Sequence, residues 1–196
     1  MTEIRQYRPT DRDDVYRICT LTGDSGNDAT GHFRSDDLLP DIYAGPYLVH
    51  DPELVRLVDA GDGAIGYVLG TTDSVAFDRW FVDTWWPSVA DEHPLEGAGE
   101  REASIIASAA AREQLPAEIL ERYPAHLHID LLPVTQGQGL GRRLIETFTE
   151  LLAARGVRGV HLGVDKRNVG AHRFYERTGF TRVGDPDGPM LYAKEL

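Results

Sequence analysis

The segment between residues 125 and 156 constrains the fold most, because the spacing of its apolar residues changes from a period of two to a period of 3.6 across a run of glycines. In AHLHIDLL, residues 125–132, apolar and polar side chains alternate as in a strand with one buried face. The segment QGQGLG follows, with glycines at every second position from Gly137 to Gly141. Apolar residues then recur at helical spacing up to Gly156, a typical helix stop. We therefore expect a strand, a glycine loop and a helix N-terminus in direct succession.

Strands and helices alternate over the remainder of the chain. Strands are expected at residues 3–7, 54–58, 64–71, 159–165, 181–184 and 190–196, and helices at 10–23, 36–53, 140–156 and 168–179. The first helix is expected to have Thr10 as its N-cap and to stop at Gly23, and the last to be capped by Asn168. The two apolar runs on either side of DAGDG predict an antiparallel hairpin.

Residues 75–123 are predicted to be a helical insertion between two strands that adds no core of its own. The strand–helix–strand unit around the glycine loop implies a right-handed parallel crossover, whereas the flanking hairpins are antiparallel. We therefore expect an α/β fold with a mixed central sheet of about six or seven strands and flanking helices.

Charge and composition exclude several classes of protein. The 196 residues carry a formal net charge of −12, and the sequence pI is 4.9. This acidity argues against the basic surface that nucleic acids require. No apolar run approaches the roughly 20 residues of a membrane helix, and the N-terminal segment lacks the apolar core of a secretory signal. A single cysteine, Cys19, excludes an internal disulfide and favours the cytoplasm. We expect residues 1–196 to form one domain that binds neither nucleic acid nor membrane.

The glycine loop has the sequence features of an anion site. A helix N-terminus exposes unpaired N–H groups, its dipole adds partial positive charge, and glycines let a phosphate approach closely. Arg142 and Arg143 lie in the first helical turn, within reach of phosphate oxygens. The dinucleotide fingerprint requires a glycine at the sixth position, which is Arg142 here, and GNDATGH has His32 where a P-loop requires lysine. The loop by itself also fits a simple connection whose glycines only satisfy backbone geometry.

A second motif, NVGAHRFYERTGF, distinguishes between these alternatives. Together with Gln136-x-x-Gly139-x-Gly141, it resembles the two characteristic segments of the GNAT superfamily of N-acetyltransferases. The matching positions in the second motif are Asn168, Ala171, Phe174, Tyr175, Gly179 and Phe180. Both segments occur in the order of that superfamily, on the expected strand–helix–strand–helix. The resemblance implies a GNAT fold.

The resemblance extends to a particular branch of the superfamily. The segments IRQYRPTDRDDVYRIC, AIGYVLGTTDSVAF, HIDLLP and RFYERTGF resemble the C-terminal acetyltransferase-like region of eukaryotic O-GlcNAcase, over nearly the whole chain. We expect a free-standing, bacterial-type relative of that region. Glycosidase activity is not implied. The intact glycine loop favours genuine acyl-CoA binding.

The resemblance also implies a co-substrate, acetyl-CoA, and no metal. In the GNAT fold two neighbouring strands splay apart, and the pantetheine arm pairs with the open strand edge, while the pyrophosphate rests on the glycine loop. The implied pantetheine positions are Ile129, Leu131, Leu132, Pro133 and Val134. The implied pyrophosphate positions are Gly137, Gln138, Gly139, Leu140, Gly141 and Arg142. Asn168, Ala171 and Phe174 would flank the arm from the other side.

The implied reaction is direct attack of an acceptor amine, from a small molecule or a protein lysine, on the thioester. Tyr175 matches the position that donates a proton to the departing thiolate, and a backbone N–H near Leu132 suits the carbonyl oxygen. For the base, Asp130 and His126 are equally ranked candidates. The glutamate that some members carry is Gly163 here, which leaves open a non-catalytic acetyl-CoA-binding module. The oligomeric state is expected to be a monomer or a homodimer.

Two further features bear on the site. His126, His128 and Asp130 share one strand face and so resemble a metal-binding triad, but the motif lacks its final histidine and lies inside a strand rather than a turn. We therefore expect no metal there. The loop GDSGNDAT, residues 23–30, is expected to line the acceptor side, with the cluster of tryptophans near residues 80–86 as a candidate aromatic surface for a cation.

Overall fold

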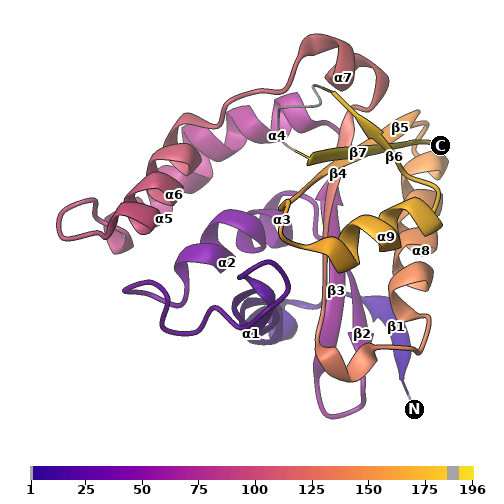
Figure 1. The fold of residues 1–196 in the computed structure, drawn as a ribbon, viewed down its shortest axis with the longest axis horizontal. Coiled ribbons are helices and arrows are strands. Elements are labelled where there is room, and N and C mark those ends of the chain that lie inside the picture. Colours follow the sequence, from indigo (N-terminus) through magenta and orange to yellow (C-terminus); the bar gives the residue numbers. More distant parts are fainter. Residues whose placement is uncertain (1, 185–189) are drawn as a thin grey trace.

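The computed structural model describes residues 2–184 and 190–196. It contains a seven-stranded sheet in the order β1-β2-β3-β4-β5-β7-β6 (Figure 1). The strands are β1 (Glu3–Gln6), β2 (Arg56–Asp59), β3 (Ala64–Thr71), β4 (Ala125–Leu131), β5 (Gly159–Val164), β6 (Thr181–Val183) and β7 (Met190–Glu195). β4 and β5 run parallel, and the other neighbouring pairs run antiparallel. The sheet is therefore mixed, as the sequence predicted.

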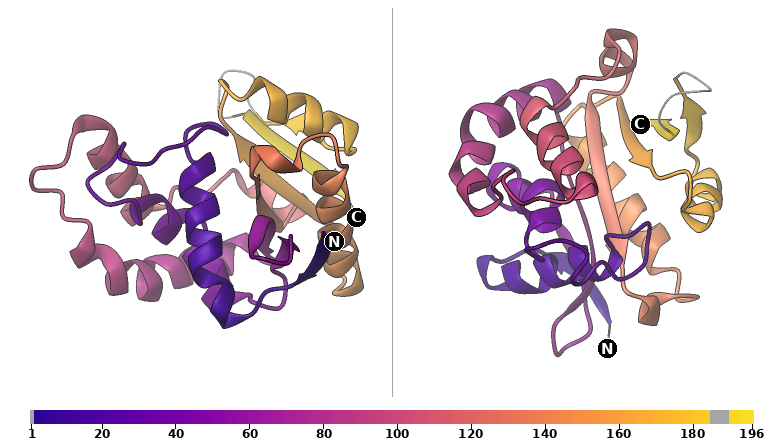
Figure 2. Two further views of the ribbon diagram at one scale, coloured as in Figure 1. Left: turned by 90° about the horizontal axis from the view of Figure 1, so that it is seen from below. Right: turned by 60° about the vertical axis from the view of Figure 1, so that its left-hand side comes forward.

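Helices cover both faces of this sheet. One face packs against α1 (Arg12–Thr22), α2 (Leu38–Tyr43) and α3 (Gly45–His50), and the other against α8 (Leu140–Ala154) and α9 (Val169–Arg177). Alternation along the strands divides the core in two. In β3, for example, Tyr67 and Leu69 join the cluster under α1, whereas Val68 joins the cluster under α8. The views in Figure 2 show the sheet between these two layers.

The start of α1 differs from the sequence prediction. Residues Pro9–Asp11 form a 3-10 turn, and the α-helix begins at Arg12, so Thr10 is not its N-cap. The reason lies in Asp11, whose carboxylate accepts the backbone N–H of Arg8 and pairs with Arg5 of β1, each at 2.7 Å. These two contacts hold the residues before the helix in a tighter turn.

The insertion between β3 and β4 is helical, as predicted. It contains α4 (Ser74–Trp80), a π turn (Phe81–Trp85), α5 (Trp86–Val89), a 3-10 turn (Ala90–Glu92), α6 (Glu100–Ala111) and α7 (Ala117–Arg122). Figure 1 shows α4, α5 and α6 as an arm beside α2. Phe77, Phe81, Trp86 and Ile106 are buried in the same apolar cluster as α1, so the arm extends that core instead of forming a second one.

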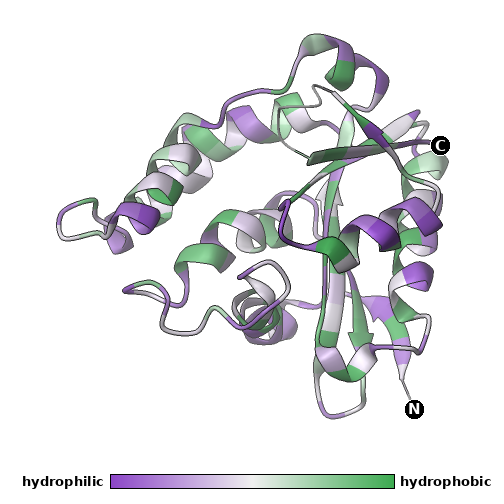
Figure 3. Ribbon diagram, viewed as in Figure 1, coloured by the Kyte–Doolittle hydropathy of each residue, from purple (hydrophilic) through white to green (hydrophobic). Residues whose placement is uncertain are grey.

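Hydropathy follows this arrangement. β3 and the sheet-facing side of α8 are largely hydrophobic, whereas the outer side of α9 is mostly hydrophilic (Figure 3). None of the helices in the described ranges combines the length and the apolarity that spanning a bilayer requires.

Candidate active site

β4 and β5 separate in the middle of the sheet. Their parallel pairing consists of Ala125 with Val160 and His126 with His161, although β4 continues to Leu131 and β5 to Val164. The right-hand view of Figure 2 shows β5 turning away from β4. The edge of β4 beyond His126 is therefore open on this side.

The register of β4 decides which backbone groups face the gap. The N–H of Leu132 donates to the carbonyl of Ile65 at 3.0 Å, and hydrogen bonding alternates along an antiparallel pair. The N–H groups of Ile129 and Leu131 consequently point away from β3, toward the gap. The N–H of Leu132 itself is used within the sheet, so the N–H of the neighbouring Leu131 is the available donor near Leu132.

The glycine loop closes one end of this gap. Gly137 and Gly139 have φ of +75° and +69°, a conformation that glycine adopts without steric cost. α8 begins directly afterwards, and its first intrahelical-type bond runs from Arg143 N–H to the Gly139 carbonyl. Within the described part of the chain, five N–H groups at this corner have no acceptor: those of Gly137, Gly139, Leu140, Gly141 and Arg142. This is the donor array that an anion requires.

A groove of about 590 Å³ runs from the glycine loop along the open edge of β4 to α9. Most of the predicted coenzyme residues line it: Ile129, Leu131, Gly137, Gly139, Leu140, Gly141, Arg142, Asn168, Ala171 and Phe174. Four do not: Leu132, Pro133, Val134 and Gln138. Leu132, Pro133 and Val134 lie in or next to a 3-10 turn (Pro133–Thr135), and the Gln138 side-chain amide donates to the Val134 carbonyl. Thr135 and Gln136 line the groove at this point.

The α9 side of the groove has the predicted cap. The side chain of Asn168 accepts the backbone N–H of Ala171 at 3.1 Å. A Cβ atom at Gly141 would lie 3.0 Å from Leu131 and 3.2 Å from the ring of Phe174, so the first turn of α8 packs closely against α9. The absence of a side chain at Gly141 therefore sets how near the two helices approach.

A second cavity of about 420 Å³ adjoins the groove. The two share Thr22, Gly26, Ile129, Asp130, Asn168, Ala171 and Tyr175. β4 forms its floor with Leu127, His128, Ile129 and Asp130, and α6 contributes Arg101 and Ile105. The loop after α1 also lines it, through Gly23, Ser25 and Gly26. The tryptophans of the insertion do not line it, because they pack within the arm.

Asp130 lies at the junction of the two cavities. Its carboxylate accepts the Tyr67 hydroxyl at 2.6 Å. Burial raises the pKa of this carboxyl, although the hydrogen bond from Tyr67 partly opposes that shift. A carboxylate of this kind is a stronger proton acceptor than an exposed aspartate.

Tyr175 also lies at this junction, on α9. Its ring is buried against Phe180 and Tyr192, with centroids 5.7 Å and 6.0 Å away. Burial, and secondarily the charge of Asp130, raises the pKa of the Tyr175 hydroxyl well above its usual range. The hydroxyl therefore stays protonated at neutral pH, as a proton donor must.

His126 is not part of either cavity. Its ring is buried, with Nδ1 2.8 Å from Ser74 Oγ and Nε2 2.7 Å from the Tyr47 hydroxyl. It lines a separate cavity of about 180 Å³ together with Arg112 and His161. Burial, and to a lesser extent the neighbouring His128, His161 and Arg112, lower its pKa well below the ordinary value. His128, which alternation places on the same face, lines both this small cavity and the second cavity.

Among the residues that the structure describes, no group of three or more histidine, cysteine, aspartate or glutamate side chains is arranged to hold a metal ion. The ring centroids of His126 and His128 are 6.2 Å apart.

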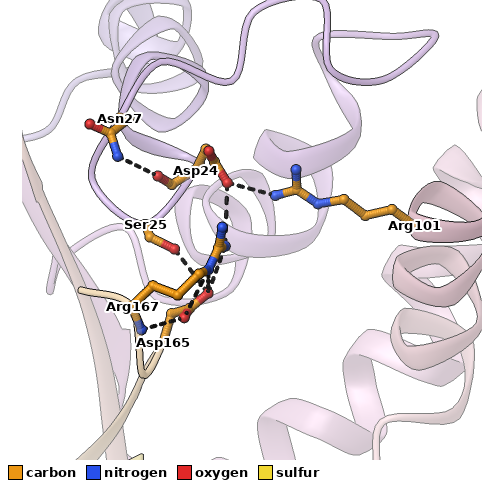
Figure 4. Close-up of polar contacts among 6 residues, drawn as sticks. All are labelled: Asp24, Ser25, Asn27, Arg101, Asp165 and Arg167. Carbon is orange, nitrogen blue, oxygen red and sulfur yellow. Dashed lines mark hydrogen bonds and ion pairs between the residues drawn. The ribbon is translucent and has the colours of Figure 1, made fainter.

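Ion pairs join the walls of the second cavity (Figure 4). The Asp24 carboxylate, in the loop after α1, contacts Arg101 of α6 at 2.9 Å and Arg167 at 3.3 Å. Arg167 also pairs with Asp165 at 2.9 Å, and Ser25 donates to Asp165 at the same distance. Asp24 thus links three separate segments around this cavity.

Comparisons with known proteins agree with this geometry. The sequence matches the acetyltransferase (GNAT) family over residues 32–180, and the chain belongs to this family. It is 25% identical over 190 residues to protein O-GlcNAcase of Rattus norvegicus, which covers 94% of this chain and 20% of that protein. Mycothiol acetyltransferase of Streptosporangium roseum is 50% identical over 62 residues, 32% of this chain and 18% of that protein. The crystal structure of SsHAT superposes with a TM-score of 0.90 at 39% identity, covering 99% of this chain and 98% of that chain.

Both resemblances drawn from the sequence, to the GNAT superfamily and to the acetyltransferase-like region of O-GlcNAcase, are thereby confirmed. The chain spans only 18–20% of the length of these two curated relatives.

Proposed function

We propose that the chain is an acetyl-CoA-dependent N-acetyltransferase, in which an acceptor amine attacks the thioester directly. The observation that carries this proposal is the junction of the two cavities. Asp130 and Tyr175 line both the groove with the anion-binding corner and the adjoining cavity. Direct transfer requires that two substrates meet at the groups that move protons, and this junction offers such a place. The acceptor is a small molecule or a protein lysine.

In this mechanism the residues have separate tasks. The five free N–H groups at the start of α8 hold the pyrophosphate. The N–H groups of Ile129 and Leu131 hold the pantetheine arm and stabilise the negative charge that develops on the thioester oxygen. Asp130 accepts the proton that the amine nitrogen loses as it forms the new C–N bond. Tyr175 donates its proton to the sulfur as the C–S bond breaks, and regains one from solvent.

We propose that Asp130, and not His126, is the base. His126 contacts neither cavity, both of its ring nitrogens have partners, and burial keeps it neutral. Asp130 has its second oxygen available beyond the Tyr67 contact.

A non-catalytic acetyl-CoA-binding module is the second candidate, and Gly163 favours it. This residue lines the second cavity at a position where some GNAT members carry a glutamate. The two proposals share the fold and the coenzyme groove, so only turnover separates them.

The experiment measures acetyl-CoA binding by calorimetry and thiol release with a broad panel of amines. Transfer to at least one amine supports the enzyme, whereas binding without transfer to any supports the module. Tyr175→Phe tests the proton donor, because it keeps the ring packing and removes only the hydroxyl. We expect this variant to slow transfer about 100-fold while the Kd for acetyl-CoA stays constant. A transfer rate that is unchanged across the pH range argues against the assigned role.

We further propose that residues 1–196 act as one catalytic domain, as a monomer or homodimer, in the cytoplasm. Cys19 is the single cysteine of the 196 residues and is buried, so no internal disulfide forms, which is in keeping with a reducing compartment.

A further inference from the structure

A hydrogen-bonded chain of four side chains crosses the face of β4 that carries its histidines. Ser74 Oγ lies 2.8 Å from His126 Nδ1, and the Tyr47 hydroxyl lies 2.7 Å from His126 Nε2 and 3.1 Å from His128 Nε2. The chain starts at the backbone of Pro124 and ends at His128, which lines the second cavity. It therefore connects the buried interior to the second cavity, which we assign to the acceptor amine because it adjoins the coenzyme groove at Asp130 and Tyr175.

The first link fixes the direction of every other link. Ser74 Oγ lies 2.7 Å from the Pro124 carbonyl, which can only accept, so the serine proton is used there. Ser74 Oγ must then accept from His126 Nδ1–H, which leaves the lone pair of His126 on Nε2. The Tyr47 hydroxyl donates its single proton to that lone pair, so its oxygen accepts from His128 Nε2–H. A neutral His128 consequently has its lone pair on Nδ1.

The surroundings keep both rings neutral. Burial lowers the pKa of His126 well below its ordinary value and that of His128 to about 4, and the positive charge of Arg112 acts in the same direction. Arg112, His161 and Asp78 also line the small cavity beside these rings, and the Asp78 carboxylate is paired with Arg112 at 2.8 Å. On the other side, Asp130 shares the floor of the second cavity.

The hydrogen-bonded chain ends at His128 Nδ1. No group in the described part of the protein donates to His128 Nδ1, although its Nε2 is held by Tyr47. Tyr47 is itself fixed by stacking on Phe77, with centroids 4.4 Å apart. Residues two apart on a strand face lie roughly 6.6 Å from each other, so one amine nitrogen can contact both His128 and Asp130.

We infer that His128 Nδ1 accepts one hydrogen of the acceptor amine beside Asp130, and that Ser74, His126 and Tyr47 are positioning residues that hold His128 in the required tautomer. This inference rests on the proposed N-acetyltransferase function. Asp130 takes the proton that leaves, while His128 holds the other N–H and so aims the nitrogen lone pair at the thioester carbon. No atom is gained or lost at His128.

The tautomer is measurable without turnover. In ¹⁵N spectra of the histidine-labelled protein at neutral pH, we expect His126 protonated on Nδ1 and His128 on Nε2. Tyr47→Phe should remove this preference at His128. Adding n-butylamine together with coenzyme A should shift the His128 Nδ1 resonance. A wild-type His128 protonated on Nδ1, a tautomer unaffected by Tyr47→Phe, or no shift with the amine overturns the inference even if no amine is acetylated.

Kinetics test the role in transfer. His128→Leu removes the hydrogen-bond acceptor at Nδ1, whereas His128→Asn places an amide oxygen, which also accepts, at the position of Nδ1. For n-butylamine we expect kcat/KM to fall about 10–100-fold in His128→Leu and to recover in large part in His128→Asn. The preference for n-butylamine over N-methylbutylamine, which has one N–H fewer, should shrink only in the leucine variant. Equal losses in both variants overturn the inference.

His161→Asn is the matched control. His161 lines the same small cavity, but its Nδ1 is bound to the Tyr123 carbonyl at 2.8 Å and it lies outside the chain of four. We expect this variant to keep the preference between the two amines. An unchanged Kd for acetyl-CoA verifies that each variant is folded. If the wild-type protein transfers to no amine, the proposed function fails, and the tautomer measurements still decide the inference.

Discussion

Gly139 and Gly156 offer a matched test of the anion-binding corner, because they flank the two ends of α8 in the same backbone conformation. Their φ angles are +69° and +76°, and a Cβ atom built at either residue meets nothing within 4 Å. An alanine at either position therefore causes no clash and costs only the strain of the left-handed conformation, about 1 kcal/mol. Chemical denaturation should show a similar loss of stability in both variants.

Only Gly139→Ala should weaken acetyl-CoA binding. Relaxing the strain at Gly139 rotates the peptide units whose N–H groups face the groove, whereas Gly156 lies at the far end of the helix. Loss of one charge-assisted hydrogen bond is worth about 1.5–3 kcal/mol, which corresponds to a Kd roughly 10–150-fold higher. Calorimetry at constant salt measures the Kd of each variant for acetyl-CoA. Equal Kd values for the two variants, whether both normal or both weak, refute the assignment of the loop as the pyrophosphate site.

Three other perturbations test separate parts of the account. Asp130→Asn keeps an oxygen that accepts the Tyr67 hydrogen bond but removes the base. We therefore expect kcat/KM to fall about 100- to 10,000-fold with little change in the Kd for acetyl-CoA. A rate near that of the wild type contradicts the role of Asp130. In the wild-type enzyme kcat/KM should rise as pH rises through the pKa of Asp130. Because burial raises that pKa, this rise should occur above the ordinary pH range of aspartate titration. A pH–rate profile without such a rise points to another base. Asp24→Asn removes the charge that pairs with Arg101 and Arg167. We expect the KM of the acceptor amine to increase a few-fold in steady-state assays while acetyl-CoA binding stays constant. A change in acetyl-CoA binding alone contradicts a role of these ion pairs on the acceptor side.

The local part of the site could be predicted from the sequence because its signals are local. The alternation before Pro133, the glycines from Gly137 to Gly141 and the cap at Asn168 each depend on a few neighbouring residues. Backbone geometry then places the loop at a helix N-terminus whatever the rest of the chain does. Gly139 and Asn168 accordingly both line the groove as expected.

Features that depend on distant partners could not be predicted from the sequence. Whether Leu131 or Leu132 has a free N–H depends on the register with β3, which no local pattern encodes. His126 looked suitable as a base, but Ser74 and Tyr47, from α4 and α3, occupy both of its nitrogens. The role that we infer for His128, to accept a hydrogen of the acceptor amine, follows from the same contacts. The alternation of β4 indicated its face, but only the folded structure shows where its hydrogen bonds lead.

The proposed mechanism requires that the thioester lie where the two cavities meet. A crystal structure of the protein with acetyl-CoA tests this most directly. We predict the pyrophosphate on the N–H groups of Gly137 to Arg142, the pantetheine arm along Ile129 and Leu131, and the sulfur within hydrogen-bonding distance of the Tyr175 hydroxyl. Acetyl-CoA bound elsewhere, or with its thioester away from Asp130 and Tyr175, contradicts the account.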